Sequence, residues 1–409
     1  MSRESEIPHL MMAAAALVGI LALVFVPIAA AGAGPSVKVI ASGLDNPRGL
    51  AFGPEGALYV VEAGRGDPGC DEQDRIDGPF GPACYGPTGA VTRILDGKQE
   101  RIVTGLSSFA SPEGRQAFGP HDISFQGQDG AYLVVGACFA SNDSCGRLLQ
   151  LSASGEWRES ADITAWELEN NPDNAHEGES NAYAVLPLSD ERIVVDAAGN
   201  TLLRVTPNGD ISLLALFPPR SIDGGETQMD AVPTSVVVGP DGAFYVPELT
   251  GFPFPVGAAR IYRVAPGEDP YAQREVYAEG FTNVIDIAFG DNGSLYVLEM
   301  AANGIPAGSD GALIRVAPDG SRETVLDEGL VAPAGVAVGD NGAIYVTNYG
   351  EDAGKGEVVR IILPATVPQE MPKTGGEHDD WVNLWLVFVA GAGLVAAGWF
   401  LHQKSIHTG

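Results

Sequence analysis

One short phrase recurs six times along this chain. It consists of a turn with Pro or Asn, an apolar strand, a Gly-containing turn and a second apolar strand that often ends in Tyr-Val. The copies lie at 46–60, 119–134, 180–195, 232–246, 284–297 and 332–346, and the third is the most degenerate. A third strand, such as 201–205, and a fourth, such as 101–106, follow the phrase. Four short strands joined by hairpin turns make one propeller blade, which buries its faces only against its neighbours.

The repeat therefore predicts an all-β fold, a six-bladed β-propeller over residues 36–363. The sixth copy stops after its third strand, at 357–363. Residues 37–44, ahead of the first copy, match the fourth-strand pattern. We expect the N-terminal strand to complete the last blade, because a closed ring leaves no strand edge unpaired.

Hydrophobic segments, expected to be helices, flank the propeller on both sides. Residues 10–33 are almost wholly apolar and end in small residues, which is typical of a secretory signal peptide. The apolar run is long for a signal peptide, so residues 1–33 are a signal peptide or an N-terminal anchor. At the other end, residues 381–401 are apolar, with Trp near both ends. They are long enough for a transmembrane helix, followed by a short cytoplasmic tail at 402–409.

A Pro-rich linker at 364–380 precedes this predicted transmembrane helix. It contains a pentapeptide that is similar to a sortase sorting signal, with Met in place of the usual Leu: Met371, Pro372, Lys373, Thr374 and Gly375. Either a sortase transfers the protein to the cell wall or the helix stays in the membrane. Both alternatives place the propeller outside the cytoplasm, anchored to the cell membrane or cell wall.

Charge and cysteine content narrow the possible partners. The chain has 23 basic and 53 acidic residues, a net charge of −30. Such a surface repels phosphate backbones, so nucleic acid is excluded as a partner. The four cysteines lie in the exported part, where disulfides form. Pairing of nearest neighbours gives Cys70–Cys84 and Cys138–Cys145; a zinc site is the alternative, without a C-x-x-C pair to support it.

The end of each second strand carries the most regular polar signal. Gly136 stands there in the second repeat, and the other five repeats have acceptor side chains: Glu62, Asp196, Glu248, Glu299 and Asn348. If equivalent positions encircle the channel, these oxygens form a ring that could hold Ca²⁺. The alternative is a structural role, in which each side chain accepts backbone N–H bonds at a turn.

A second set of polar residues lies where the first strands begin. Its types vary from blade to blade, as expected for a ligand pocket at the channel mouth: Arg48, His121, Asp122, Asn181, Thr234, Asn283 and Asp286. His121 and Asp122 are the candidates for catalysis, although a single buried His is more often a satisfied core residue. No nucleophile elbow, zincin or P-loop motif is present in the sequence, which favours a role other than catalysis.

Two stretches resemble the ScyD/ScyE family: Tyr245–Val264, which begins Tyr-Val-Pro-Glu-Leu-Thr-Gly, and Val195–Val205. The opening Gly43–Leu50 fits as well, and the resemblance covers the propeller. It implies an NHL-type propeller and carries no settled activity. Together these features predict an extracytoplasmic binding or scaffold module for a protein, glycan or small molecule. The alternatives are a Ca²⁺-dependent hydrolase or lactonase and a sugar dehydrogenase-like enzyme.

Overall fold

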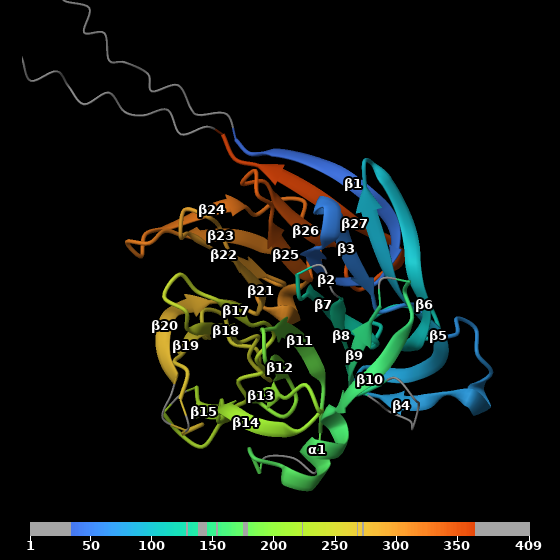
Figure 1. The fold of residues 1–409 in the computed structure, drawn as a ribbon. Coiled ribbons are helices and arrows are strands. Elements are labelled where there is room, and N and C mark those ends of the chain that lie inside the picture. Colours follow the sequence, from blue (N-terminus) through green and yellow to red (C-terminus); the bar gives the residue numbers. More distant parts are fainter. Residues whose placement is uncertain are drawn as a thin grey trace, which may run out of the picture. The chain divides into compact units, whose positions relative to one another are not determined.

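The protein is described by a computed structural model, which covers residues 34–364 except 128–129, 138–144, 153, 175–178, 223, 268 and 272–273. The repeats form six antiparallel sheets around a common axis, with the first strand of each sheet innermost (Figure 1). The predicted six-bladed β-propeller is confirmed. The predicted segments 1–33, 381–401 and 402–409 and the sorting motif 371–375 lie outside the described residues.

The blades follow one another along the chain. Blade 1 contains β2 (Pro47–Phe52), β3 (Leu58–Glu62), β5 (Gly81–Leu95) and β6 (Lys98–Ala110). Blade 2 contains β7 (Pro120–Phe125), β8 (Ala131–Val135), β9 (Arg147–Leu151) and β10 (Trp157–Asp162). Blade 3, from the degenerate repeat, is as regular as the others, with β11 (Ala182–Pro187), β12 (Arg192–Asp196), β13 (Thr201–Val205) and β14 (Ile211–Leu216).

The second half of the ring repeats this order. Blade 4 contains β17 (Val237–Val238), β18 (Phe244–Pro247), β19 (Ala259–Val264) and β20 (Arg274–Phe281). Blade 5 contains β21 (Val284–Phe289), β22 (Leu295–Glu299), β23 (Ala312–Val316) and β24 (Arg322–Leu326). Blade 6 contains β25 (Gly335–Val338), β26 (Ile344–Asn348), β27 (Ala353–Ile362) and the N-terminal strand β1 (Ser36–Asp45).

The closure predicted from the sequence is present. Strand β1 pairs antiparallel with β27, from Ser36 opposite Ile362 to Asp45 opposite Ala353. Buried side chains of this last blade, including Leu44 and Val358, pack against Leu50 and Val60 of blade 1. Comparable buried clusters fill the other blade interfaces, so the core is distributed around the ring.

The Gly-containing turn of the repeat has a local physical cause. In the turn between β25 and β26, Asn341 Oδ1 accepts a hydrogen bond from the backbone N–H of Ala343 at 3.0 Å. Gly342 adopts a φ of +71°, which favours glycine. Asp241 and Asn292 bond their own turns in the same way. The Asp/Asn-Gly motif therefore encodes an Asx turn that sets the hairpin register.

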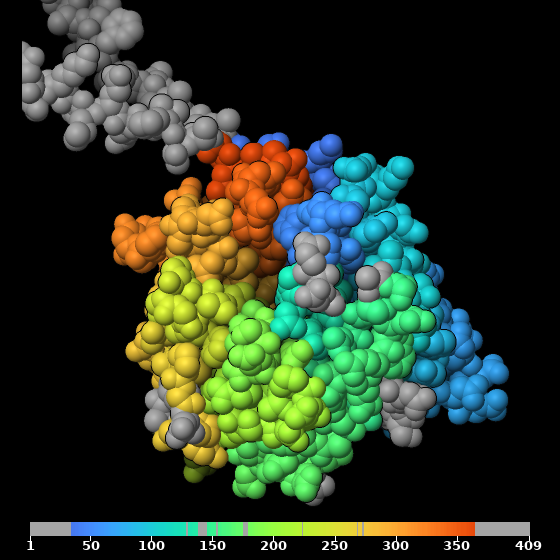
Figure 2. Space-filling view, in the orientation of Figure 1, coloured from blue at the N-terminus to red at the C-terminus, as the bar shows by residue number. Residues whose placement is uncertain are grey.

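Insertions between the repeated strands add further elements. They are β4 (Ile76–Gly78), the ribbon of β15 (Arg220–Ser221) and β16 (Gln228–Met229), helix α1 (Ile163–Asn170), and three 3-10 turns, η1 (Pro54–Gly56), η2 (Glu72–Asp74) and η3 (Ile305–Ala307). Strand β4 pairs with the start of β5, and this hairpin stands out from the ring (Figure 2, blue). Within the described residues, no helix has the length and hydrophobicity to cross a membrane.

Candidate functional site

The acceptor side chains that end the second strands bond mainly to the backbone ahead of their own blade. Glu62 accepts from the N–H of Asp45, Glu299 from that of Thr282 and Asn348 from that of Val331, each at 2.7 Å. In all three blades the two residues are 17 positions apart. Each bond ties the connection that enters a blade to that blade's second strand.

Of the two remaining acceptors, one binds backbone N–H groups and the other binds an arginine. Asp196 accepts from the N–H groups of Asn181 and Gly199 at 2.7 and 3.0 Å. Glu248 contacts the guanidinium of Arg220 at 2.7 Å. Burial raises the pKa of Glu248 and of Glu299 to about 7. Among the described residues, no three His, Cys, Asp or Glu side chains come close enough together to hold a metal ion. These contacts are those expected if the acceptor side chains have a structural role, in which they bond the backbone. Calcium binding by the ring stays a prediction.

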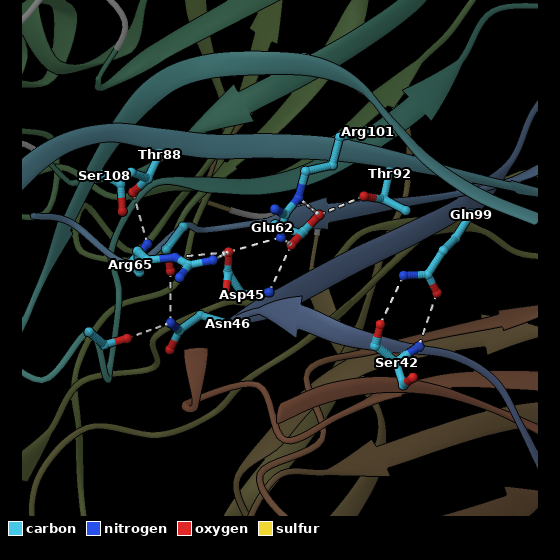
Figure 3. A network of polar contacts seen from close by, with 12 residues as sticks. Ser42, Asp45, Asn46, Glu62, Arg65, Thr88, Thr92, Gln99, Arg101 and Ser108 are labelled. Carbon is cyan, nitrogen blue, oxygen red and sulfur yellow. Dashed lines mark hydrogen bonds and ion pairs between the residues drawn. The ribbon is translucent and has the colours of Figure 1, made fainter. Parts of the chain in front are cut away.

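The acceptor of blade 1 belongs to a larger ionic network (Figure 3). Arg101 lies within 2.5 Å of Glu62 and 2.8 Å of Asp45, and Arg65 bonds the same Asp45 carboxylate. Thr92 donates to Glu62 at 2.6 Å. Asp45 ends β1, whereas Glu62 and Arg101 lie in β3 and β6. The network therefore joins the N-terminal strand to the first blade.

Two of the residues predicted at the channel mouth are satisfied by the backbone. Thr234 donates to the carbonyl of Val284 at 3.0 Å. The Asn283 side chain donates to the carbonyl of Leu249 and accepts from the N–H of Ile305, at 2.9 and 3.2 Å. Both side chains are buried. These contacts hold neighbouring loops and strands together, which is a structural role.

Asp122 and Asp286 occupy equivalent positions in the inner strands of blades 2 and 5. Asp122 accepts from the N–H of its neighbour Ile123 and from that of Val185 in blade 3, at 2.8 and 2.9 Å. Asp286 accepts from Ile287 and from Val336 in blade 6 in the same manner, and also from Ser235. Each carboxyl therefore bonds the inner strand of the next blade.

The environment of these two carboxyls disfavours their charge. Burial raises the pKa of Asp122 to about 8, with a further contribution from Asp286. Burial likewise raises the pKa of Asp286 to about 6. Some of each side chain is nonetheless accessible. We interpret this combination as a position inside the channel, enclosed by protein but open to its lumen.

Blade 2 differs from the other blades where His121 lies. Its acceptor position is Gly136, and a Cβ atom there would lie 2.2 Å from the His121 ring and 2.3 Å from Asn181 Oδ1. The missing side chain therefore leaves the space that His121 and Asn181 fill. The His121 ring is 4% exposed and stacks on Tyr183 with the ring centroids 4.5 Å apart. Within the described residues, neither nitrogen of His121 has a hydrogen-bond partner.

Arg48 lies close enough to His121 to affect its charge. Its Nη atoms donate to the carbonyls of Gly350 and Ala117 at 2.8 and 2.7 Å. Burial, followed by the charge of Arg48, lowers the pKa of His121 to about 3, and the nearby Asn181 opposes this shift. The imidazole is therefore neutral at physiological pH, and one of its nitrogens can accept a hydrogen bond. We call Arg48, His121, Asn181 and Tyr183 the channel-mouth cluster.

The structure thus brings four of the predicted channel-mouth residues close together: Arg48, His121, Asp122 and Asn181. Tyr183 was not predicted to belong with them. The sequence contained two indications that Tyr183 belongs to this site. Tyr183 lies two residues after the predicted Asn181, and blade 2 is the one repeat with a glycine, Gly136, in place of an acceptor. The stacking of Tyr183 on His121 joins two different blades, which a single repeat does not reveal.

The disulfide prediction concerns the hairpin beside this site. Cys70 and Cys84 are bonded, with their Cα atoms 6.1 Å apart. Cys145 is also disulfide-bonded, and its predicted partner Cys138 lies outside the described residues. The first bond attaches the irregular segment after Cys70 to strand β5, and so holds the β4–β5 hairpin in place.

Solved structures of other proteins share this fold. A putative oxidoreductase (glucose dehydrogenase) from Thermus thermophilus is 18% identical over 80% of this chain and 100% of its own, with a TM-score of 0.50. Another glucose dehydrogenase is 16% identical over 80% and 99%, also with a TM-score of 0.50. A Bacteroides thetaiotaomicron protein of unknown function is 12% identical over 81% and 73%, with the same TM-score.

These likenesses, all below one fifth identity, show the fold alone. No protein-family model matches the chain, and no curated protein matches its sequence. The resemblance to the ScyD/ScyE family therefore stays a prediction.

Proposed function

We propose that the protein is an extracytoplasmic propeller that binds a small polar ligand at the channel-mouth cluster. One observation carries this proposal: neither nitrogen of the buried His121 imidazole makes a hydrogen bond of normal geometry among the described residues, and Asn181 is the polar side chain beside the ring. An unmade hydrogen bond in a buried group costs about 1–3 kcal/mol. A ligand hydroxyl that bonds either nitrogen would recover this energy, and Tyr183 offers a second polar group beside it.

The composition of blade 2 supports the same proposal. The other blades hold an acceptor that binds backbone or, in blade 4, Arg220, and blade 2 has Gly136 instead. Glycine at this position removes the hydrogen bond that an acceptor side chain would make, and it leaves space for the neutral His121 imidazole. Ligand sites combine a few well-placed polar groups with apolar or aromatic walls, as His121 and Tyr183 do.

NMR of the histidine rings tests this proposal directly. The His121 signals are expected to stay unchanged between pH 5 and 8, because the pKa of the ring is about 3. We expect them to shift when a binding member of a set of sugars, lactones and polyols is added. The H121A variant identifies the signal and should lose the binding. A ring that titrates near pH 6.5 and responds to no member of the set would contradict the proposal.

Gly136→Ala provides a second variant that leaves His121 in place. Its methyl group would overlap the His121 ring and Asn181, so we expect lost binding and a destabilisation of about 1–3 kcal/mol. Gly290→Ala is the control, because a Cβ atom there approaches no other atom closer than 3.2 Å. Equal binding by the two variants would argue against the cluster as the site.

A second candidate function is an enzyme that acts on a sugar or lactone held beside His121. Two proteins of the same fold are described as glucose dehydrogenases, which favours it, whereas a pKa of about 3 makes His121 a weak base. An anionic quinone cofactor does not fit well, because Arg48 already donates to two carbonyls. Among the described residues, no three His, Cys, Asp or Glu side chains form a group that could hold a metal ion, and bound calcium stays a prediction. If the wild type converts a lactone or a sugar and the H121A variant does not, this result would favour the enzymatic function.

A further inference from the structure

A line of aromatic side chains runs from the channel-mouth cluster to the surface. Tyr183 stacks on His121, whose ring is 6.5 Å from that of Phe118 in an edge-to-face arrangement. Phe118 stacks in turn with Phe80, with centroids 5.8 Å apart and the planes inclined by 22°. We call Phe80, Phe118, His121 and Tyr183 the aromatic track. It starts at the tip of the β4–β5 hairpin and ends on the inner strands.

Backbone bonds and a disulfide hold this track in position. Phe118 exchanges two backbone hydrogen bonds of 2.7 Å with Phe109, at the end of the outer strand β6. Phe80 lies in the turn of the hairpin, between Gly78 and its partner Gly81. The Cys70–Cys84 bond fixes the base of the same hairpin. The ring of Phe80 is therefore presented at a defined place, although it is 71% exposed.

An exposed aromatic ring that the chain fixes in this way suits a binding surface. Phe80 and Phe118 also line a narrow cleft of about 20 Å³ under the hairpin. The buried end of the track is His121, whose nitrogens have no partner among the described residues. The track therefore has an exposed aromatic ring, Phe80, at its outer end and hydrogen-bonding groups at its buried end.

We propose that the aromatic track binds a neutral oligosaccharide, with one end at His121 and the chain extending outward over Phe118 to Phe80. This inference rests on the proposed function and names its ligand class. Sugar rings present C–H faces that stack on aromatic rings, and hydroxyl groups that bond a neutral imidazole. The spacings of 6.5 and 5.8 Å along the track are similar to the length of one hexose unit.

Charge favours a neutral ligand over an anionic one. The whole chain carries a net charge of −30, and the segment that leads into the hairpin contains Asp71, Glu72, Asp74 and Asp77. An acidic glycan would be repelled by this surface. A basic peptide would be attracted to it, but a peptide held by charge alone makes no use of the neutral His121.

The test measures the affinity of the full chain for glucose and for neutral gluco-oligosaccharides and N-acetylglucosamine oligomers, up to the hexasaccharide. We expect the affinity of the wild type for one series to rise with length. Phe80→Ala should lower the affinity for the long members by about three- to tenfold and leave the monosaccharide unaffected. Phe252→Ala is the matched control, because Phe252 is 80% exposed on a loop of blade 4, outside the track.

A second variant tests the hairpin without changing the track. The double substitution Cys70→Ser with Cys84→Ser frees the base of the hairpin, so we expect it to lose the advantage of the longer oligomers and keep the binding of the monosaccharide. H121A should weaken the binding of every length. Far-ultraviolet circular dichroism of each variant confirms that the propeller is folded.

Several outcomes would overturn the inference while the proposed function stands. One is monosaccharide binding that depends on His121 but gains nothing from length. Another is an equal effect of the Phe80 and Phe252 substitutions. A third is Phe80-dependent binding of a basic peptide with no response to any oligosaccharide. Failure of every ligand to shift the His121 signals would instead contradict the proposed function itself.

Discussion

His121 illustrates how one glycine changes the role of its neighbours. In the blades that have an acceptor at the end of the second strand, that side chain is bonded to backbone or to an arginine. In blade 2, Gly136 cannot form this bond, and His121 and Asn181 fill the space. The same position stabilises the fold in five of the repeats, and in the remaining one, blade 2, it belongs to the candidate site.

Glu167 carries a prediction about pH. It lies in helix α1, is 1% exposed, and its Oε2 atom has no partner within the described residues. Burial, with contributions from Asp196 and Asp173, raises its pKa to about 8. The folded state therefore holds this proton more tightly than the unfolded state does. Its contribution to stability is complete below pH 4.5 and is lost as the pH rises through 8.

We expect Glu167→Gln to reduce the loss of stability between pH 6.5 and 9 by on the order of 1–3 kcal/mol. His121, Asp122, Glu248 and Glu299 also affect stability in this range, but they are the same in both proteins, so the difference between the two pH curves reports Glu167. The control is Glu169→Gln, which changes an exposed residue of the same helix. Denaturant unfolding at several pH values gives the comparison. Parallel pH curves for wild type and Glu167→Gln would show that this carboxyl does not titrate in that range.

Strand pairing at the closure depends on charges as well as on the backbone ladder. The network of Figure 3 places Arg101 from β6 between Glu62 of β3 and Asp45 of β1. Both carboxylates are buried, so each needs the cation or backbone donors nearby. The network thus stabilises the interface at which the first and last segments of the ring meet.

Removal of this cation is expected to destabilise the ring. Arg101→Met leaves two buried carboxylates without their shared partner and should cost roughly 2–4 kcal/mol of unfolding free energy. Arg93→Met removes an exposed pair with Glu100 in the same blade, at 3.4 Å, and should cost less than about 1 kcal/mol. Chemical denaturation compares the two variants. Equal losses would show that the network adds nothing beyond a surface ion pair.

The ring closes through β1, and this arrangement also sets where the chain enters and leaves. Ser36 and Ile362 are partners at one end of the β1–β27 pair. Asp45, at the other end of β1, lies next to the start of β2, where the channel-mouth cluster begins. The described chain therefore starts and stops at the face opposite the candidate site.

Deletion of residues 1–45 should prevent stable closure, because it removes β1 and exposes the edge of β27. We expect a lower melting temperature, or aggregation seen by size-exclusion chromatography. Deletion of residues 1–33 alone keeps β1 and should leave the melting temperature unchanged. An equally stable, monomeric protein after both deletions would show that the ring closes without the N-terminal strand.

The repeat pattern in the sequence was sufficient to predict six blades, their order and the closing strand. This was possible because each blade is encoded locally, by apolar strands and Asp/Asn-Gly turns within one repeat. The disulfide of Cys70 and Cys84 was predictable for the same reason, since both residues belong to one insertion. The inserted hairpin, ribbon and helix follow no repeat and were not predicted.

The candidate site depended on contacts between blades, which no single repeat contains. The first strands pointed to Arg48, His121 and Asn181, but the stacking of His121 on Tyr183 and the gap left by Gly136 arise only when blades 2 and 3 pack together. The predicted acceptor ring shows the converse. Its residues share a position in the repeat, yet each is bound by backbone N–H groups or by an arginine of its own blade or of the connection that enters it, because buried polar groups need a partner.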